Sequence, residues 1–229
     1  LPPNKFEAFA LNKTNKKYSA LIADDDILFV KGINECINYL EKNQDFIACN
    51  GQVYNFSLGP MMKANGTLLG FKNYVFHSSD SETNKKRIIN YLQKQDSLLS
   101  SVIRRKALSS AMDLVVPMSD YHSVYVYGEV IPIIFILNLG KVKTLQVDYC
   151  ARQAHMGSLY SKYNIFNMFC DYEMNIANRI FLEELKKSFD KIKSKIILEQ
   201  FLKSILEELI TMNNYQRSFI YKLYSKFKI

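Results

Sequence analysis

The sequence lacks the signatures of several common protein classes. No stretch approaches the roughly eighteen apolar residues that a membrane-crossing helix needs, and the longest apolar stretch, residues 130–137, contains Pro132. Neither a GxxxxGKS nor a GxGxxG loop occurs, so these two phosphate-binding signatures are missing. No internal repeat is evident. What remains is the composition of an ordinary globular protein, with 48% hydrophobic and 23% charged residues.

The cysteines show neither a CxxC pair nor the spacing of a zinc site. Cys36 falls on the apolar face of a predicted helix and Cys49 falls in a predicted strand, so we expect both thiols to be buried. Free thiols are typical of a reducing compartment. The sequence therefore predicts a cytoplasmic protein.

The positive charge is concentrated near the C-terminal end. From Lys186 onward the chain has ten Lys or Arg residues against four Asp or Glu, so this part contains +6 of the net charge of +8. Residues 215–229 mix aromatic, apolar and basic residues with helical spacing. Such a helix can lie on an anionic membrane, or it can pack on its own domain or on a second subunit. We expect a helical region over residues 159–229, with peripheral contact to the inner face of the membrane and homo-oligomer formation both left open.

Three consecutive carboxylates, Asp24, Asp25 and Asp26, follow a stretch over residues 18–23 that we predict to be a strand. Desolvating adjacent carboxylates costs several kcal/mol unless a cation or a strong donor lies among them. Oxygen ligands of this kind suit Mg²⁺ or Mn²⁺. The alternative is a solvated acidic turn in which Asp26 caps the next helix, because Asp is common in turns and at helix N-termini.

Alternating helices and strands are predicted after the acids. Hydrophobic spacing predicts helices over residues 31–43, 82–95, 106–112 and 166–185, and strands over residues 46–56, 97–103 and 142–149. Gly51 lies inside the strand 46–56, where a side chain would obstruct a neighbour. Residues 58–70 read as a loop. This order of elements predicts an α/β fold.

The acids and the thirty or so residues after them resemble the GT-A glycosyltransferases, most closely the bacterial, family-2-like members with a DDD motif. The resemblance covers the acids, the following helix, Asn43-Gln44-Asp45, and the strand with Asn50-Gly51. It implies that Asp24 faces the donor ribose and that Asp26 ligates the metal, with Asp25 able to replace either. It also implies a GT-A-like domain with a mixed sheet flanked by helices, over residues 1–158.

The resemblance also implies that part of the usual domain is missing. In GT-A enzymes the metal motif normally follows a βαβ unit that binds the nucleotide, whereas only 23 residues precede Asp24. We therefore expect that this chain is a fragment that lacks most of the N-terminal nucleotide-binding unit.

The same resemblance suggests further site residues. Glu129, at the start of an apolar helix, corresponds to the family's general base, with Asp120 as the second choice, although many relatives have two consecutive acids where this chain has Glu129-Val130. A carboxylate at a helix start is also favoured by the helix dipole alone. Arg104 and Arg152 are candidates for binding the donor phosphates. His155 is the candidate for an additional metal ligand.

The sequence thus predicts a metal-dependent enzyme that moves a sugar from a nucleoside-diphosphate donor to a hydroxyl of a surface glycan or a lipid-linked acceptor, with inversion. One alternative is a sugar-nucleotide nucleotidyltransferase, although the Gly-rich N-terminal loop of such enzymes is missing. Another is a non-catalytic scaffold whose basic tail binds a membrane or nucleic acid. We expect no nucleic acid partner, because the aromatic and basic residues mix in terminal helices and not on strands.

Overall fold

A computed structural model describes residues 3–58, 68–74, 76–94, 96–118, 124–153 and 174–203. The chain divides into two compact units, residues 1–188 and 189–229. In the second unit the described part is mainly a helix over residues 191–203. Asp190 starts this helix, since its Oδ1 accepts a hydrogen bond from the Lys193 backbone N–H at 2.9 Å.

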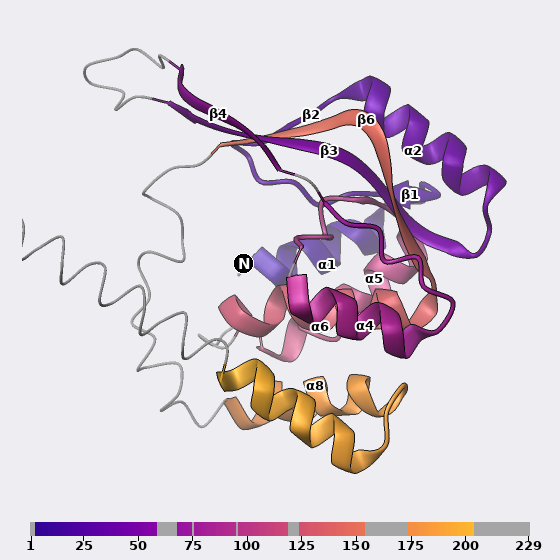
Figure 1. Ribbon diagram of the computed structural model, residues 1–229, viewed down its shortest axis with the longest axis vertical. Helices are drawn as coiled ribbons and strands as arrows, with labels where there is room; N and C mark the ends of the chain where they lie inside the picture. The colour runs from indigo at the N-terminus through magenta and orange to yellow at the C-terminus, as the bar shows by residue number, and fades with distance from the viewer. Residues whose placement is uncertain are drawn as a thin grey trace, which may run out of the picture. The chain divides into compact units, whose positions relative to one another are not determined.

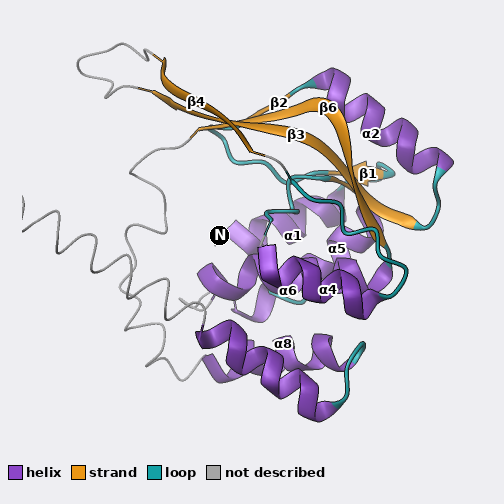
Figure 2. Cartoon of the chain, in the orientation of Figure 1, coloured by secondary structure: helices purple, strands orange, loops and turns teal. Residues whose placement is uncertain are grey.

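The first unit is built on a mixed sheet that has six strands among the described residues (Figure 2). The strand order is β1-β5-β3-β6-β2, and β4 pairs with the outer half of β3. The two long central strands, β3 (Phe46–Leu58) and β6 (Lys141–Gln153), run parallel to each other. Each remaining strand pairs antiparallel to its neighbour: β1 (Tyr18–Ser19), β2 (Ile27–Leu28), β4 (Leu68–Tyr74) and β5 (Val102–Arg104).

Helices cover both faces of the sheet (Figure 1). One face has α2 (Val30–Lys42), and the other has α1 (Pro3–Lys13), α4 (Asn84–Lys94), α5 (Arg105–Asp113) and α6 (Val124–Leu139). A short 3-10 turn, η1 (Val116–Met118), follows α5, and α8 (Met174–Lys186) packs against α6. The predicted α/β class, with a mixed sheet flanked by helices, is confirmed.

The core between α2 and the sheet follows from helical spacing. Cys36 and Leu40, one turn apart, are fully buried and pack with Cys49 and Tyr149 of the sheet. Gly32, one turn earlier, lies so close to β6 that a Cβ atom would be 2.2 Å from the Asp148 carbonyl oxygen. Glycine is required there because α2 contacts the β6 backbone directly.

On the opposite face, α6 is apolar all round and therefore buried. Ile131, Ile133, Ile134 and Leu137 are each 0% exposed, and α4, α5 and α8 contact the helix. The contact with α8 includes the rings of Tyr127 and Phe181, whose centroids lie 5.6 Å apart. Through this contact α8 belongs to the first compact unit, which extends to Ser188.

The connection over residues 20–26 runs from one edge of the sheet to the other. β1 pairs with β5 and β2 pairs with β6, so these two strands, close in sequence, are the first and last in the strand order. The predicted strand over residues 18–23 is therefore wrong beyond Ser19, because the chain leaves β5 there to cross the sheet. The three acids lie in a turn before β2, where the Asp26 N–H donates to the Ala23 carbonyl at 3.2 Å.

Most other expected elements are confirmed with shifted ends. The helices α2, α4, α5 and α8 and the strands β3 and β6 lie where hydrophobic spacing placed them, although residues 166–173 lie outside the described part. The expected strand 97–103 is confirmed only from Val102. β4 lies partly in the stretch that was expected to be a loop. None of the described helices has the length and apolar character needed to cross a membrane.

Candidate functional site

Arg152, near the end of β6, is the centre of a polar cluster on the face of the sheet covered by α4–α6. Its Nη2 donates to Ser100 Oγ at 2.6 Å and to Ser97 Oγ at 3.3 Å. The guanidinium lies over the Phe76 ring, with Cζ 5.5 Å from the centroid. These contacts fix the planar guanidinium in one orientation.

Asp26, the last acid of the turn, lies beside this arginine. Its Oδ1 accepts a hydrogen bond from the Gln153 backbone N–H at 3.1 Å, and its Oδ2 lies 3.8 Å from Arg152 Nε. The Asp26 side chain is only 13% exposed. Arg152 Nε is buried and has no hydrogen-bond acceptor among the described residues. The site therefore has a buried N–H donor that an acceptor oxygen of a ligand can satisfy.

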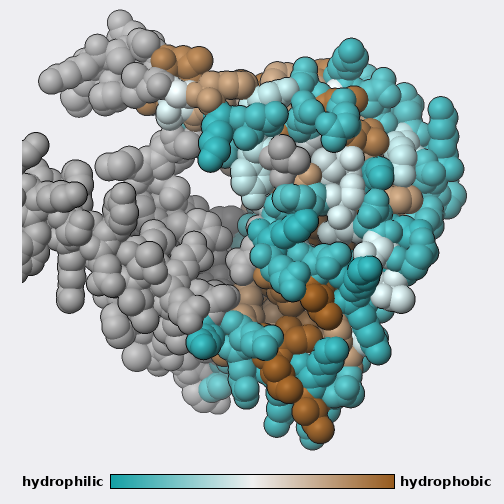
Figure 3. All heavy atoms as spheres, viewed as in Figure 1, coloured by the Kyte–Doolittle hydropathy of each residue, from teal (hydrophilic) through white to brown (hydrophobic). Residues whose placement is uncertain are grey.

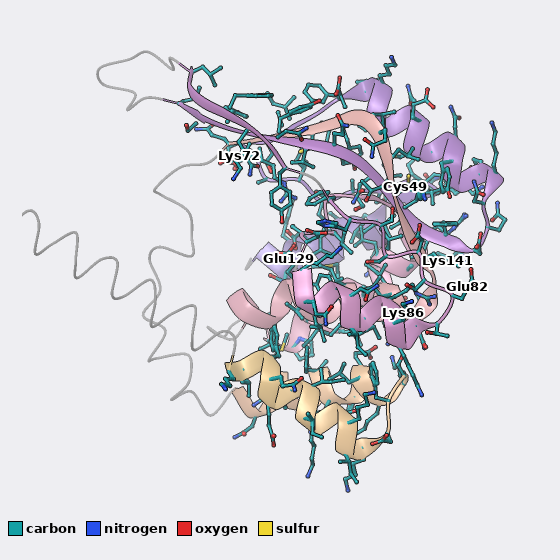
Figure 4. The ribbon with its side chains drawn as sticks, viewed as in Figure 1. Cys49, Lys72, Glu82, Lys86, Glu129 and Lys141 are labelled. Atoms are coloured by element: carbon teal, nitrogen blue, oxygen red, sulfur yellow. The ribbon has the colours of Figure 1, made fainter. Side chains whose placement is uncertain are left out.

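Glu129 joins the same cluster through Ser97. The Ser97 hydroxyl donates a hydrogen bond to Glu129 Oε1 and accepts one from Arg152. Glu129 lies in the second turn of α6, and Figure 4 places it between that helix layer and the sheet. A carboxylate is favoured near a helix N-terminus by the helix dipole. The structure thus brings Asp26, Arg152 and Glu129 together, from three segments far apart in the sequence.

A buried carboxylate, Asp96, lies next to Ser97 in the chain. It is 4% exposed and accepts hydrogen bonds from the His77 N–H at 3.0 Å and from the Tyr74 hydroxyl at 3.1 Å. His77 Nδ1 is 3.2 Å from the same carboxylate. Burial, together with the Asp96 carboxylate, raises the pKa of Tyr74 above its usual value. This group supports the segment from which Ser97 and Ser100 project.

Sequence reasoning missed Ser97, Ser100 and Asp96. The available signal was a run of polar residues, Asp96, Ser97, Ser100 and Ser101, among the apolar residues of a predicted strand. In the structure this run is not a strand but the irregular segment before β5, and most of its polar residues are buried.

The remaining acids of the turn have different surroundings. Asp24 is exposed and Asp25 is half-buried. Among the described residues, no group of three or more His, Cys, Asp or Glu side chains is arranged to hold a metal ion. Carboxylate oxygens fit Mg²⁺ or Mn²⁺, and such ions are often held by one or two carboxylates with ligand phosphates and water completing the coordination. The carboxylates of this turn fit a site of this kind, in which ligand phosphates and water complete the coordination.

Arg104, another predicted site residue, lies away from this cluster. Arg104 donates from Nε to the Phe46 carbonyl at 3.0 Å and from Nη2 to the Leu40 carbonyl at 2.8 Å. Phe46 begins β3, whereas Gln153, beside Asp26, pairs with Phe56 near the far end of that strand. Arg104 therefore ties the C-terminal end of α2 to the sheet, away from the acids. Asp120 and His155 lie outside the described residues.

Comparison with known proteins adds no relative to this description. No protein-family model matches the chain, and a search of curated proteins found no match.

Proposed function

We propose that the chain is a GT-A-type glycosyltransferase that moves a sugar from a nucleoside-diphosphate donor to a hydroxyl of a surface glycan or a lipid-linked acceptor. The main support is the cluster around Arg152, which joins the acidic turn to Glu129 through Ser97. Transfer of this kind requires a site for a diphosphate and a base for a hydroxyl proton at one place. A solvated acidic turn would give no reason for Asp26 to be partly buried against an arginine.

In this proposal Glu129 is the general base. Its carboxylate takes the proton of the acceptor hydroxyl as that oxygen attacks the anomeric carbon, and the sugar leaves the diphosphate with inversion. The Ser97 hydroxyl holds the carboxylate in position through its hydrogen bond. Arg152 donates its unused Nε–H to a diphosphate oxygen, and its Nη2 remains bonded to Ser100.

The acids of the turn have two roles. Asp26 orients the Arg152 guanidinium and, with Asp24 or Asp25, provides carboxylate oxygens for Mg²⁺ or Mn²⁺. The bound ion supplies Lewis acidity that neutralises the negative charge of the leaving diphosphate. Asp24, which is exposed, can also accept a hydrogen bond from the donor ribose.

The proposal is tested by Mn²⁺-dependent hydrolysis of a panel of UDP- and GDP-sugars. We expect the wild type to release nucleoside diphosphate from at least one donor, and Asp26→Asn and Glu129→Gln each to lower the rate about 10²-fold or more. Glu35→Gln is the matched control, since Glu35 is an exposed carboxylate on α2. Mn²⁺ binding in the presence of UDP, followed by electron paramagnetic resonance, should be lost in Asp26→Asn and kept in Glu129→Gln.

Three results would contradict the proposal. Equal rates for the wild type and Asp26→Asn would remove the role of the acidic turn. Unchanged turnover in Glu129→Gln would remove the general base. Failure of every UDP- and GDP-sugar to bind or react would reject donor chemistry of this class.

A further inference from the structure

A hollow lies on the face of the sheet opposite the Arg152 cluster, beside the start of α2. Its volume is about 530 Å³. Strands β3, β4 and β6 form its floor, and the first residues of α2 form one wall. Six side chains define this sheet-face groove: Phe29, Lys31, Tyr54, Phe71, Gln146 and Asp148.

The aromatic rings of the groove form a contiguous surface. The Tyr54 and Phe71 rings are stacked, with centroids 5.1 Å apart and an angle of 22° between planes. Phe29 meets the Tyr54 ring edge-on at 6.5 Å. Phe71 is nevertheless 61% exposed. Figure 3 shows apolar side chains gathered along the part of the sheet where β3 and β4 pair. An aromatic pair that is ordered by stacking but open to solvent is suited to a ligand with an apolar face.

Polar groups line the same floor in a connected row. The Tyr54 hydroxyl donates to the Asp148 carboxylate, and Gln52 Oε1 lies 3.2 Å from that hydroxyl. Gln52 Nε2 in turn donates to Gln146 Oε1 at 3.0 Å. Each of these hydrogen bonds uses only some of the donors and acceptors that an amide or a carboxylate has. The Gln146 amide N–H groups and the second Asp148 oxygen can therefore bond hydroxyl groups of a ligand.

The charge of the groove favours a neutral ligand. Lys31 and Asp148, its two charged side chains, have opposite signs. Lys72 follows Phe71 on β4 and so lies on the opposite face of the strand (Figure 4). Nucleic acid and anionic membranes both need an excess of basic side chains over acidic ones. The groove has no such excess among its lining residues.

The groove is separate from the Arg152 cluster but lies directly behind it. Ala151 lines the groove, and Arg152, the next residue of β6, belongs to the cluster on the other face. A polymeric ligand that passes around the edge of the sheet can contact both the groove and the Arg152 cluster, whereas a single sugar unit cannot contact both.

From these observations we infer that the sheet-face groove binds a saccharide unit of a neutral glycan. The C–H face of a pyranose ring stacks on Phe71 and Tyr54, and its hydroxyls bond Gln146 and Asp148. The further step, that this glycan is the acceptor held at a unit remote from the reacting hydroxyl, rests on the proposed function. Saccharide binding itself does not.

The chain has no tryptophan, which makes a direct experiment available. Phe71→Trp keeps an aromatic ring in the groove and introduces a single indole fluorophore. The probes are neutral hexasaccharides of glucose, xylose, mannose and N-acetylglucosamine. We expect at least one probe to change the fluorescence of Phe71→Trp saturably, and the same probe to bind the wild type in calorimetry. Phe6→Trp, at a 59% exposed position on α1, is the matched control and should not respond.

Phe71→Ala should weaken binding of that saccharide about tenfold, as expected for loss of an aromatic anchor. Phe6→Ala should leave the affinity unchanged, and so should Asp26→Asn, so that saccharide binding is measured independently of the proposed transfer. No response to any hexasaccharide, or equal affinity in Phe71→Ala and the wild type, would overturn the inference. So would a dimer in the wild type that Phe71→Ala dissociates, or Phe71-dependent binding of an oligonucleotide or of phosphatidylglycerol vesicles in place of the saccharides.

Discussion

Arg152 and Asp26 face each other at the end of the central strand pair, with Nε and Oδ2 3.8 Å apart. The carboxylate comes from the connection between two edge strands, and the guanidinium comes from β6. Neither charge is fully solvated, because the side chains are 13% and 25% exposed for Asp26 and Arg152. This pair is what connects the acidic turn to Ser97 and, through it, to Glu129.

Two replacements of Arg152 should distinguish the effect of its positive charge from the effect of its planar guanidinium geometry. Arg152→Gln removes the guanidinium from beside the Asp26 carboxylate, and we expect the free energy of unfolding to fall by about 1–3 kcal/mol. Arg152→Lys restores the charge but not the planar fork that bonds Ser97 and Ser100, so stability should largely recover while donor turnover stays low. Urea denaturation and turnover measure the two effects. Arg179→Gln, at an exposed position of α8, is the control and should change neither.

Replacing Gly32 or Gly51 by alanine should lower stability far more than replacing Gly70. A Cβ atom on Gly51 would lie 2.4 Å from the Val147 carbonyl oxygen, and one on Gly32 would lie 2.2 Å from that of Asp148. Backbone atoms cannot move aside cheaply, so Gly51→Ala and Gly32→Ala should each lower the free energy of unfolding by about 1–3 kcal/mol. Gly70→Ala meets only the Ser57 hydroxyl, at 3.1 Å, and should stay within about 0.5 kcal/mol in the same urea titration. Three equal losses would contradict this reading of the packing.

The core thiols should be unreactive until the protein unfolds. Cys36, Cys49 and Cys150 are each 0% exposed, and neighbouring groups and burial raise the pKa of the Cys36 thiol far above its usual value. Thiolate is the reactive form, so native protein should not react with a thiol reagent at these positions at pH 8. The measurement uses Cys170→Ser, in which only these three cysteines remain. We expect three equivalents to react in denaturant, and rapid labelling without denaturant would show that the core opens.

The carboxyl group of Glu7 should make stability depend on pH. Burial on α1 raises the pKa of this group above its usual value, so the folded protein keeps the proton at a pH where the unfolded chain has lost it. The stabilisation is complete below the unfolded pKa of about 4.3 and is lost as pH rises through the folded pKa. Glu7→Gln removes this dependence. Its melting temperature should match the wild type near pH 4 and exceed it at pH 7, measured by thermal denaturation.

The helices of this fold could be predicted because their spacing is local. Cys36 and Leu40 repeat at one helical turn, and the structure buries both against the sheet. The prediction that a side chain at Gly51 would obstruct a neighbour is confirmed, although the sequence could not identify Val147 as that neighbour. The predicted burial of Cys36 and Cys49 is also confirmed, and it too depended on local sequence spacing.

Partners across the sheet could not be predicted from the sequence. β1 and β2 are two residues long, too short for an alternating pattern, so no sequence pattern indicated that they lie at opposite edges. Arg104 was a reasonable phosphate ligand by type, yet its guanidinium bonds the carbonyls at the end of α2. Ser97 was missed because its role depends on Glu129 and Arg152, and only the folded chain brings these together.

The connection that crosses the sheet has a consequence for biosynthesis. Tyr18 of β1 pairs with Arg104, and Leu28 of β2 pairs with Cys150. Both strands that flank the acidic turn therefore cannot pair until β5 and β6 have been synthesised. Chains emerge from the ribosome N-terminus first, and contacts between distant segments form slowly. The acids are thus synthesised before the strands that hold them, and they reach their final positions only after β6 has been made. A nascent chain released before β6 would have the whole acidic motif and none of its geometry.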